Sequence, residues 1–328
     1  MPDDAARADA GLTDAVPNAG LNDAEQAALL VLETLDAAGY AFTAPTPETH
    51  RRVVARASMR TARDLRGVFG WSLPFEYEVL GPELLALMRR ARLLRETSAG
   101  LVSKVRASRV RGQLFLHSAY PTTSDESVFL GPDSIRFADF LVAQLFARDG
   151  VARLVDIGAG AGVGGIVAAA ALPDAAIELV DINQAALSLA RVNAAHAGIC
   201  AITYESDAVA GVAPGFDVAI ANPPFIIDED GPAYRAGGDL HGARLSLDWT
   251  LAAAEKVAPG GRVLLYTGSA IVDGRDALLG ALEDRLPALG CVLRYRELDP
   301  DIFGDQLDHP GYEDVERIAA IGAVVTKE

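Results

Sequence analysis

The chain has 328 residues, half of them apolar, and a formal net charge of −16 at pH 7. This length suits two domains, and the apolar half supplies a large core, which excludes a wholly disordered protein. No apolar run approaches the roughly 20 residues that a membrane span needs, and the acidic start lacks the basic region of a signal peptide. We therefore expect a cytoplasmic protein, with Cys200 and Cys291 buried as free thiols.

The charge is unevenly distributed along the chain. Between Arg51 and Gly112 there are 14 Lys and Arg residues against 5 Asp and Glu residues, a local balance of +9, which leaves −25 for the remainder. Such asymmetry can mark a nucleic-acid footprint on one domain, and Arg106, Arg109 and Arg111 would then belong to a basic face. Solvated faces of amphipathic helices explain the same pattern, so both interpretations stay open.

The first part of the sequence predicts a short tail, a helical domain and a linker. Residues 1–20 are rich in Ala, Asp and Gly without an apolar period, which is typical of a flexible tail. Residues 21–100 contain three helical patterns, of which Asn22 caps the first and Thr46 the second. Residues 101–128 alternate β-branched with polar side chains and are interpreted as a β-hairpin or extended linker.

From residue 129 onward the pattern is that of a single α/β domain, which we place at 129–328. A turn and a helix that Gly150 ends come first, and strands then alternate with helices. This alternation indicates parallel strands with right-handed crossovers, hence an open sheet whose ligands bind at the carboxyl ends of its strands. The strands are expected at 151–157, 176–182, 200–206, 216–221, 261–267, 291–298 and 317–325.

A glycine-rich turn follows the first of these strands. In "VDIGAGAGVGG", Gly158, Gly160 and Gly162 stand where the backbone turns sharply into a helix and where a ligand can approach without meeting a Cβ atom. Together with Gly165, the last two also satisfy the G-x-G-x-x-G pattern of dinucleotide sites. The turn alone therefore does not identify its ligand.

Two carboxylates stand where the next two strands end. Asp181 lies 23 residues after Gly158, where it can accept hydrogen bonds from two ribose hydroxyls. Because NAD and S-adenosylmethionine both contain such a ribose, Asp181 does not distinguish between them. Asp207 follows the third strand, where it can accept a hydrogen bond from the exocyclic amine of adenine, although a surface-loop aspartate would look the same.

The fourth strand ends directly in Asn-Pro-Pro-Phe, residues 222–225. Taken together, "VDIGAGAG", Asp181, Asp207 and "NPPF" resemble the class I S-adenosylmethionine-dependent methyltransferases, in the branch that methylates planar amino nitrogens. The resemblance covers residue 129 to the C-terminus. It implies an α/β fold with a seven-stranded Rossmann-like methyltransferase sheet, mostly parallel with the last strand antiparallel, beside the helical N-terminal domain. It also implies S-adenosylmethionine as the cofactor.

The resemblance further implies which residues contact that cofactor. Gly158 and Gly160 would line the methionine portion, while Asp181 and Asp207 would bind the ribose and the adenine. The segment just upstream resembles the one that closes over the cofactor in these enzymes, and it contains Asp133 and Ser134. The full implied set is Asp156, Gly158, Gly160, Gly162, Asp181, Ile182, Asp207, Ala208 and Asn222.

Residues 222–225 are predicted to hold the substrate. A conjugated amine is a poor nucleophile, and two acceptors that grip both of its N–H groups localise its lone pair and aim it at the methyl donor. The Asn222 side-chain oxygen and the Pro223 carbonyl would be those acceptors, because the prolines fix the direction of the carbonyl. Phe225 would stack on the flat substrate; the alternative is an N-P-P turn with a core Phe. Further substrate contacts are expected from Pro224, Tyr234 and Arg235, and the histidines show no metal-ligand spacing.

Four functions remain open at this point. The first is an N-methyltransferase acting on an exocyclic nucleobase amine in RNA, adenine N6 or guanine N2, with the basic segment contacting the nucleic acid. The second is a protein glutamine N5-methyltransferase of the release-factor type, against which Phe225 counts because those enzymes carry Tyr there. An NAD-dependent oxidoreductase leaves the Asn-Pro-Pro-Phe sequence unexplained, and a non-catalytic binding module leaves Asn222 without a purpose.

Overall fold

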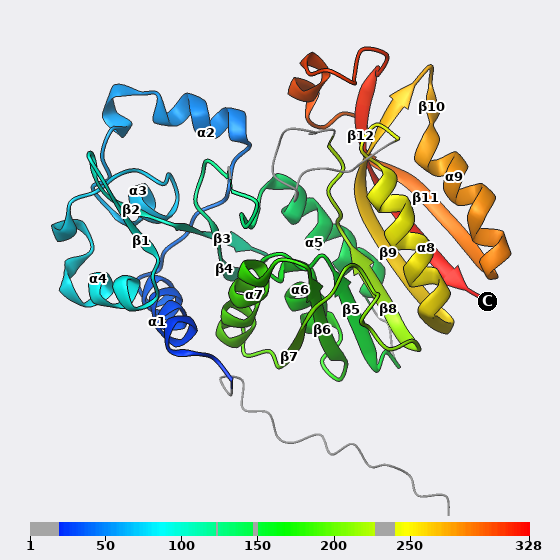
Figure 1. The fold of residues 1–328 in the computed structure, drawn as a ribbon, viewed down its shortest axis with the longest axis horizontal. Helices are drawn as coiled ribbons and strands as arrows, with labels where there is room; N and C mark the ends of the chain where they lie inside the picture. Colours follow the sequence, from blue (N-terminus) through cyan, green and yellow to red (C-terminus); the bar gives the residue numbers. More distant parts are fainter. Residues whose placement is uncertain (1–19, 123, 147–149, 227–239) are drawn as a thin grey trace, which may run out of the picture.

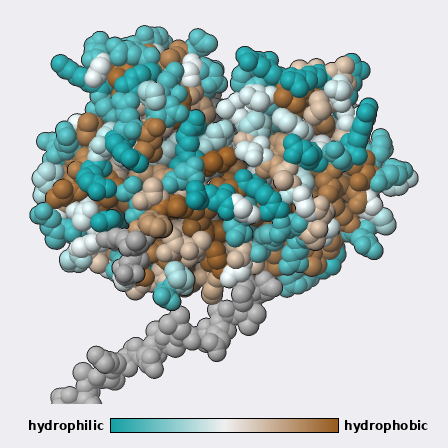
Figure 2. Space-filling view, turned by 180° about the vertical axis from the view of Figure 1, so that it is seen from behind, coloured by the Kyte–Doolittle hydropathy of each residue, from teal (hydrophilic) through white to brown (hydrophobic). Residues whose placement is uncertain are grey.

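The computed structural model describes residues 20–122, 124–146, 150–226 and 240–328 (Figure 1). Two parts lie side by side. We call the part up to residue 122 the N-terminal lobe, and the part from residue 124 onward the sheet lobe. Seen from behind, an indentation separates the two lobes at one end of the molecule (Figure 2).

The N-terminal lobe consists of short helices followed by two hairpins. Asn22 caps the first helix by accepting hydrogen bonds from the backbone N–H groups of Ala24 and Glu25 at 2.9 and 3.0 Å, and Thr46 caps the second. Both caps were expected from the sequence. The helices are α1 (Asp23–Ala37), α2 (Pro47–Val54), α3 (Leu65–Phe69) and α4 (Gly81–Arg90). The strands are β1 (Leu94–Thr97) with β2 (Gly100–Ser103), and β3 (Val105–Val110) with β4 (Gln113–Ser118).

The sheet lobe contains one large sheet with the strand order β11-β12-β9-β8-β5-β6-β7. Strands β5 to β9 are mutually parallel, whereas β12 runs antiparallel to both β9 and β11. The expected α/β sheet, mostly parallel with its last strand antiparallel, is therefore confirmed, and β10 (Arg275–Asp276) adds a short eighth strand beside β9. The main strands are β5 (Arg153–Ile157), β6 (Ala176–Asp181), β7 (Ala201–Glu205), β8 (Phe216–Ala221), β9 (Val257–Val272), β11 (Cys291–Asp299) and β12 (Arg317–Lys327).

Helices cover both faces of this sheet. Side chains of a strand alternate between faces, so Leu154 of β5 packs with the helices of one face and Val155 with those of the other. The first face is covered by α5 (Pro132–Leu145), α6 (Val163–Ala171) and α7 (Gln184–His196), and the second by α8 (Arg244–Lys256) and α9 (Ala277–Arg285). Fully buried strands of this kind explain the continuous apolar runs in the sequence.

Polar side chains of α7 help to join the lobes. The carboxylate of Glu25 on α1 accepts hydrogen bonds from Arg191 and Ser188 of α7. The buried Asn193 amide, also on α7, exchanges hydrogen bonds of 2.8 and 2.9 Å with the backbone of Leu116 in β4 and donates another, of 2.8 Å, to the Ala161 carbonyl. One side chain thus fixes a hairpin of the N-terminal lobe to the turn that follows β5.

Only one of the two cysteines is buried, as was expected of both. Cys291 is buried, but Cys200 is exposed, so the expectation of two buried thiols was wrong for Cys200, which precedes the edge strand β7. None of the helices in the described ranges is long and apolar enough to cross a membrane.

We predict that close packing of α6 on the sheet makes Gly165 irreplaceable. A Cβ atom at this position would lie 2.3 Å from Cδ2 of Leu179, whereas one at the exposed helical Gly280 would meet nothing within 4 Å. Gly165→Ala should lower the free energy of unfolding by about 1–3 kcal/mol through overpacking, and Gly280→Ala should raise it by about 0.5–1 kcal/mol. Urea unfolding of both variants measures this, and equal effects would contradict it.

Candidate active site

The site is built at the carboxyl ends of two neighbouring parallel strands. Ile157, the last residue of β5, pairs directly with Ala221, the last residue of β8. The next residues along the chain are Gly158 and Asn222, so the glycine turn and the Asn-Pro-Pro-Phe segment leave the sheet side by side. This is the position between β5 and β8 at which the strand order reverses direction, where open α/β sheets bind their ligands.

The glycine turn adopts a backbone that other residues rarely tolerate. Gly158, Gly160 and Gly162 have φ angles of +67°, +53° and +80°. A Cβ atom on Gly158 would lie 2.6 Å from the ring of Trp249, which packs against it from α8. A Cβ atom on Gly160 would touch only Val128 among the described residues, at 3.9 Å. The backbone of Gly160 is therefore open to a ligand.

Asp181 holds this turn in place. One of its carboxylate oxygens accepts a hydrogen bond of 2.8 Å from the Gly160 N–H, and the other accepts one of 2.8 Å from the Asn183 N–H. Burial raises the pKa of this carboxyl above its ordinary value. Because each carboxylate oxygen can accept more than one hydrogen bond, acceptor capacity remains for ribose hydroxyls, and that role stays a prediction.

Three further predicted cofactor contacts, among them Asp207 for the adenine, lie near Asp181. The side chain of Ile182 is 70% exposed, and Asp207 is exposed as well. Ala208 adopts a left-handed backbone with a φ of +44°, and the Ser206 N–H donates to the Asp181 carbonyl, which brings the end of β7 to the end of β6. An apolar surface beside an exposed carboxylate suits a flat base with an exocyclic amine.

Asp156 lies beneath the turn. It is buried, its carboxylate accepts a hydrogen bond of 2.7 Å from the Gly165 N–H, and a Cβ atom on Gly164 would meet the same oxygen at 2.8 Å. Burial raises its pKa to about 7. The contact that the structure gives Asp156 is therefore with the first turn of α6, and its predicted role toward the cofactor stays a prediction.

Asn222 presents an unused acceptor at this edge. Its side chain is half-buried, and its Oδ1 atom is buried without a hydrogen-bond donor among the described residues. Leaving such an acceptor unpaired costs about 1–3 kcal/mol. A ligand that brings an N–H group would remove this cost. Pro223, buried, and Pro224, half-buried, follow it directly.

Phe225 points into the protein. Its side chain is 9% exposed, its ring lies against Gly268 of β9, where a Cβ atom would come within 2.3 Å, and its centroid is 5.7 Å from that of Phe303. Burial of this kind is what the alternative interpretation, an N-P-P turn with a core Phe, describes. Stacking of Phe225 on a substrate stays a prediction.

The segment after Phe225 contains two predicted substrate contacts, Tyr234 and Arg235, which lie outside the described residues. From residue 240 onward the chain is described again. Leu240, His241 and Gly242 all have left-handed backbones, with φ angles of +58°, +51° and +90°. A Cβ atom on Gly242 would lie 2.5 Å from the Phe225 carbonyl oxygen. Positive φ angles are uncommon for residues other than glycine, such as Leu240 and His241, and Gly242 lies directly against the Asn-Pro-Pro-Phe segment.

Tyr266 completes the site, and no sequence pattern pointed to it. It follows Leu265 of β9, the partner of Ala221 in β8, and therefore neighbours Asn222. Its hydroxyl donates a hydrogen bond of 3.1 Å to Oδ1 of Asp133, whose other oxygen is buried without a partner in the described part of the chain. Burial raises the pKa of Asp133 to about 6. Ser134, next to it, accepts a hydrogen bond from the Gly131 N–H and so stabilises the start of α5.

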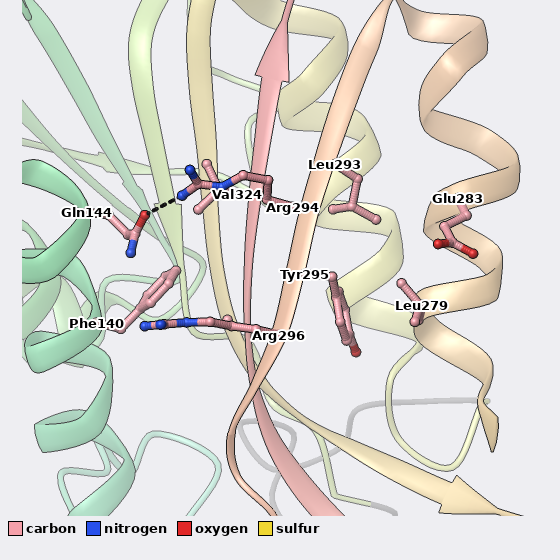
Figure 3. Close-up of a pocket in the computed structure, with 10 residues that line it drawn as sticks. Phe140, Gln144, Leu279, Glu283, Leu293, Arg294, Tyr295, Arg296 and Val324 are labelled. Carbon is pink, nitrogen blue, oxygen red and sulfur yellow. Dashed lines mark hydrogen bonds between the residues drawn. The ribbon is translucent and has the colours of Figure 1, made fainter. Parts of the chain in front are cut away.

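A separate hollow lies elsewhere and is not this site. It has a volume of about 660 Å³ and lies along the edge strand β11, between α5 and α9 (Figure 3). Arg294 donates to Gln144 across it at 3.2 Å. None of the predicted site residues lines this hollow. The described residues also contain no group of His, Cys, Asp or Glu side chains arranged to hold a metal ion.

We predict that Asp156 makes stability fall as the pH rises. Its pKa is about 7 in the folded protein and 3.8 without burial, so the folded state retains the proton more strongly than the unfolded state does. The resulting stabilisation is complete below pH 3.8 and is lost as the pH rises to about 7. Asp156→Asn retains the acceptor for Gly165 but cannot ionise, so its unfolding free energy should fall less between pH 4.5 and 7.5. Parallel urea titrations of both proteins would reveal this, and identical pH profiles would contradict it.

Comparison with known proteins is consistent with this geometry. Residues 123–236 match the sequence family described as Methyltransferase small domain. The release factor glutamine methyltransferase of Deinococcus radiodurans is 30% identical over 187 residues, which are 56% of this chain and 66% of that protein. The ribosomal RNA small subunit methyltransferase C of Hahella chejuensis is 45% identical over 73 residues, 22% of this chain and 21% of that protein. The chain thus spans less than two thirds of the length of either relative.

Among solved structures, the T. thermophilus 16S rRNA N2 G1207 methyltransferase in complex with AdoMet and guanosine superimposes with a TM-score of 0.45 at 17% identity. That superposition covers 78% of this chain and 64% of the other. The match to the sequence family includes the glycine turn, Asp181 and Asn222, the residues that the sheet brings to one edge. The segment that forms this edge of the sheet is therefore similar to the methyltransferase small domain family.

Proposed function

We propose that this protein is an S-adenosylmethionine-dependent N-methyltransferase that acts on a planar amino group, an exocyclic nucleobase amine of RNA. The single observation that carries the proposal is the Oδ1 atom of Asn222, which is buried without a donor among the described residues and lies beside the glycine turn. A buried acceptor beside the Gly160 backbone, which a ligand can approach, is suited to an amine that must be held while it reacts.

The residues around the turn fit the proposed cofactor. S-adenosylmethionine, when bound, supplies a methyl group on a positively charged sulfur. The backbone at Gly158 and Gly160 would lie against the methionine portion because neither position has a side chain. Asp181 would accept from the ribose hydroxyls, and the exposed Ile182 and Asp207 would bind the adenine.

Asn222 and Pro223 would position the substrate amine. Its two N–H groups would donate to Asn222 Oδ1 and to the Pro223 carbonyl, which localises the nitrogen lone pair and directs it along the transfer axis. Proline restricts the backbone before and within the segment, so the carbonyl direction is fixed before substrate arrives. No strong base is required, because the amine becomes acidic once it is methylated and loses its proton afterwards.

Exposed arginines of the N-terminal lobe support a nucleic acid as substrate. The three arginines singled out from the sequence do not form the expected face: Arg106 is buried, and Arg109 and Arg111 pair with Asp36 and Asp139. A different set is exposed without an ion pair in the described part of the chain, between α2 and α3. We call this set, Arg56, Arg60 and Arg63, the α2–α3 arginines.

A glutamine side chain in a protein is the second candidate substrate. Its amide has the same planar NH₂ group, and the longer of the two alignments above is to a release factor glutamine methyltransferase. Phe225 and the α2–α3 arginines favour RNA. Incubation of the protein with methyl-labelled S-adenosylmethionine and separate ribosomal RNA, DNA and release-factor fractions should label the RNA, and label in release factor alone would select the second candidate.

We predict that Asn222→Ala lowers methyl transfer by about 100-fold or more, because one of two acceptors that position the amine is removed. Cofactor binding should change much less, as the glycine turn and Asp181 are intact. Single-turnover methyl transfer and calorimetric titration with S-adenosylhomocysteine separate the two effects. Gln144→Ala, which removes an amide of α5 outside the site, serves as the control and should keep full activity. Unchanged turnover in Asn222→Ala would refute the proposal that Asn222 Oδ1 positions the substrate amine.

We also predict that the α2–α3 arginines contact phosphates. Replacing all three by Gln should weaken RNA binding and reduce the slope of log affinity against log salt, by about 0.7 for each phosphate of single-stranded RNA that is no longer neutralised. Arg285→Gln, at an exposed position on α9, is the control and should leave the slope unchanged. An unchanged slope in the triple variant would exclude this surface.

A further inference from the structure

Arg106 of β3 is a buried cation without an acidic partner among the described residues. Its side chain is 4% exposed and its guanidinium carbon lies 5.3 Å above the centroid of the Phe42 ring. Two of its donors, Nε and Nη2, are buried and have no acceptor within the same ranges. Arginine is always charged in proteins, so these nitrogens keep their hydrogens and still require acceptors.

Two histidines with unused ring nitrogens surround it. His117 of β4 pairs directly across the hairpin from Arg106, and His50 of α2 stacks on Tyr120 with a centroid distance of 4.4 Å. The Nε2 atom of His117 bonds to the Ser108 hydroxyl at 2.8 Å, but Nδ1 of each histidine is buried without a partner in the described ranges. Burial and the charge of Arg106 lower the pKa of both rings, to about 4 for His50, so both are neutral at pH 7.

No carboxylate in the described part of the chain balances this charge, which sets Arg106 apart from comparable arginines. Three half-buried arginines each meet an acidic side chain: Arg109 meets Asp36, Arg153 meets Glu178, and Arg191 meets Glu25. The groups that act electrostatically on Arg106 are the phenols of Tyr40 and Tyr120, and burial lowers its pKa to about 10. A water molecule can accept hydrogen bonds from Arg106, but it brings no countercharge, and an uncompensated buried charge is strongly destabilising.

We propose that Arg106, together with His50 and His117, forms a binding site for a phosphate group. The guanidinium edge offers two N–H donors in a fixed fork, and the imidazole rings offer further donors from two other elements, α2 and β4. A phosphate has three or more strong acceptor oxygens and matches donors that converge from several directions better than a carboxylate with two. The half-buried Tyr120 and Trp71 flank His50.

This site is distinct from the candidate active site, but its position suits a nucleic acid. His50 lies on α2, which precedes the α2–α3 arginines along the chain, so a phosphodiester bound by those arginines is one source of the phosphate. A phosphodiester of RNA as the ligand rests on the proposed function. Inorganic phosphate as the ligand is independent of it. The two sources therefore require separate measurements.

Calorimetric titration of the full chain with inorganic phosphate, without cofactor or RNA, tests the site. Wild-type protein should bind phosphate and melt at a higher temperature in its presence. Arg106→Gln should lower phosphate affinity by about 10-fold or more, since a charge-assisted pair of hydrogen bonds is removed, and Arg285→Gln, at an exposed position on α9, should bind as wild type. Without phosphate, Arg106→Gln should melt no lower than wild type, because an unbalanced charge has been removed.

Arg106→Lys provides a second test, because it keeps the charge and removes only the paired N–H donors of the guanidinium group. The phosphate affinity of this variant should fall several-fold. The proposal is overturned if wild-type protein shows neither heat nor a rise in melting temperature with phosphate relative to equal chloride, or if both Arg106 variants retain the full effect. A loss of RNA affinity in Arg106→Gln that Arg285→Gln does not show identifies the phosphodiester as the source. Phosphate binding with unchanged RNA affinity identifies the free ion instead.

Discussion

The pairing of Ile157 with Ala221 is the constraint on which the site depends. Because β5 and β8 are parallel and adjacent, both chains leave the sheet in the same direction and at the same level. The glycine turn and Asn222 are 64 positions apart in sequence, and the sheet alone makes them neighbours. Tyr266 joins them by the same logic, through the pairing of Leu265 with Ala221, and it brings Asp133 of α5 into contact with the site.

Buried polar groups in the described part of this molecule are of two kinds, those with hydrogen-bond partners and those without. Asp156, Asn193 and Glu25 are buried, and each is satisfied by backbone or side-chain partners that fix one element against another. Asn222 and Arg106 are different, since an acceptor of the first and two donors of the second are buried without partners in the described residues. Since burial of unpaired polar atoms opposes folding, such positions indicate ligands rather than packing.

The two lobes have different proposed roles and are held together by hydrogen bonds. The sheet lobe provides the edge where the amine and the cofactor would meet, and the N-terminal lobe is tied to it through α7 by Asn193 and Glu25. The same hydrogen-bonded amide reaches the Ala161 carbonyl in the glycine turn, so the position of the N-terminal lobe is coupled directly to that of the site. A macromolecule held by the first lobe would thus be held at a fixed distance from the second.

The sequence by itself determined the α/β class, the strands, the glycine turn and the Asn-Pro-Pro-Phe segment, because periodicity, glycine and proline act locally on the backbone. It did not reveal that Arg106 is buried while Arg56 is exposed, that Phe225 packs on Gly268, or that Tyr266 reaches Asp133. Burial and partner choice depend on which elements meet. Charge counted along a sequence therefore located a basic lobe but not which of its arginines are exposed, and only the packing of α2, α3 and the β3–β4 hairpin decided that.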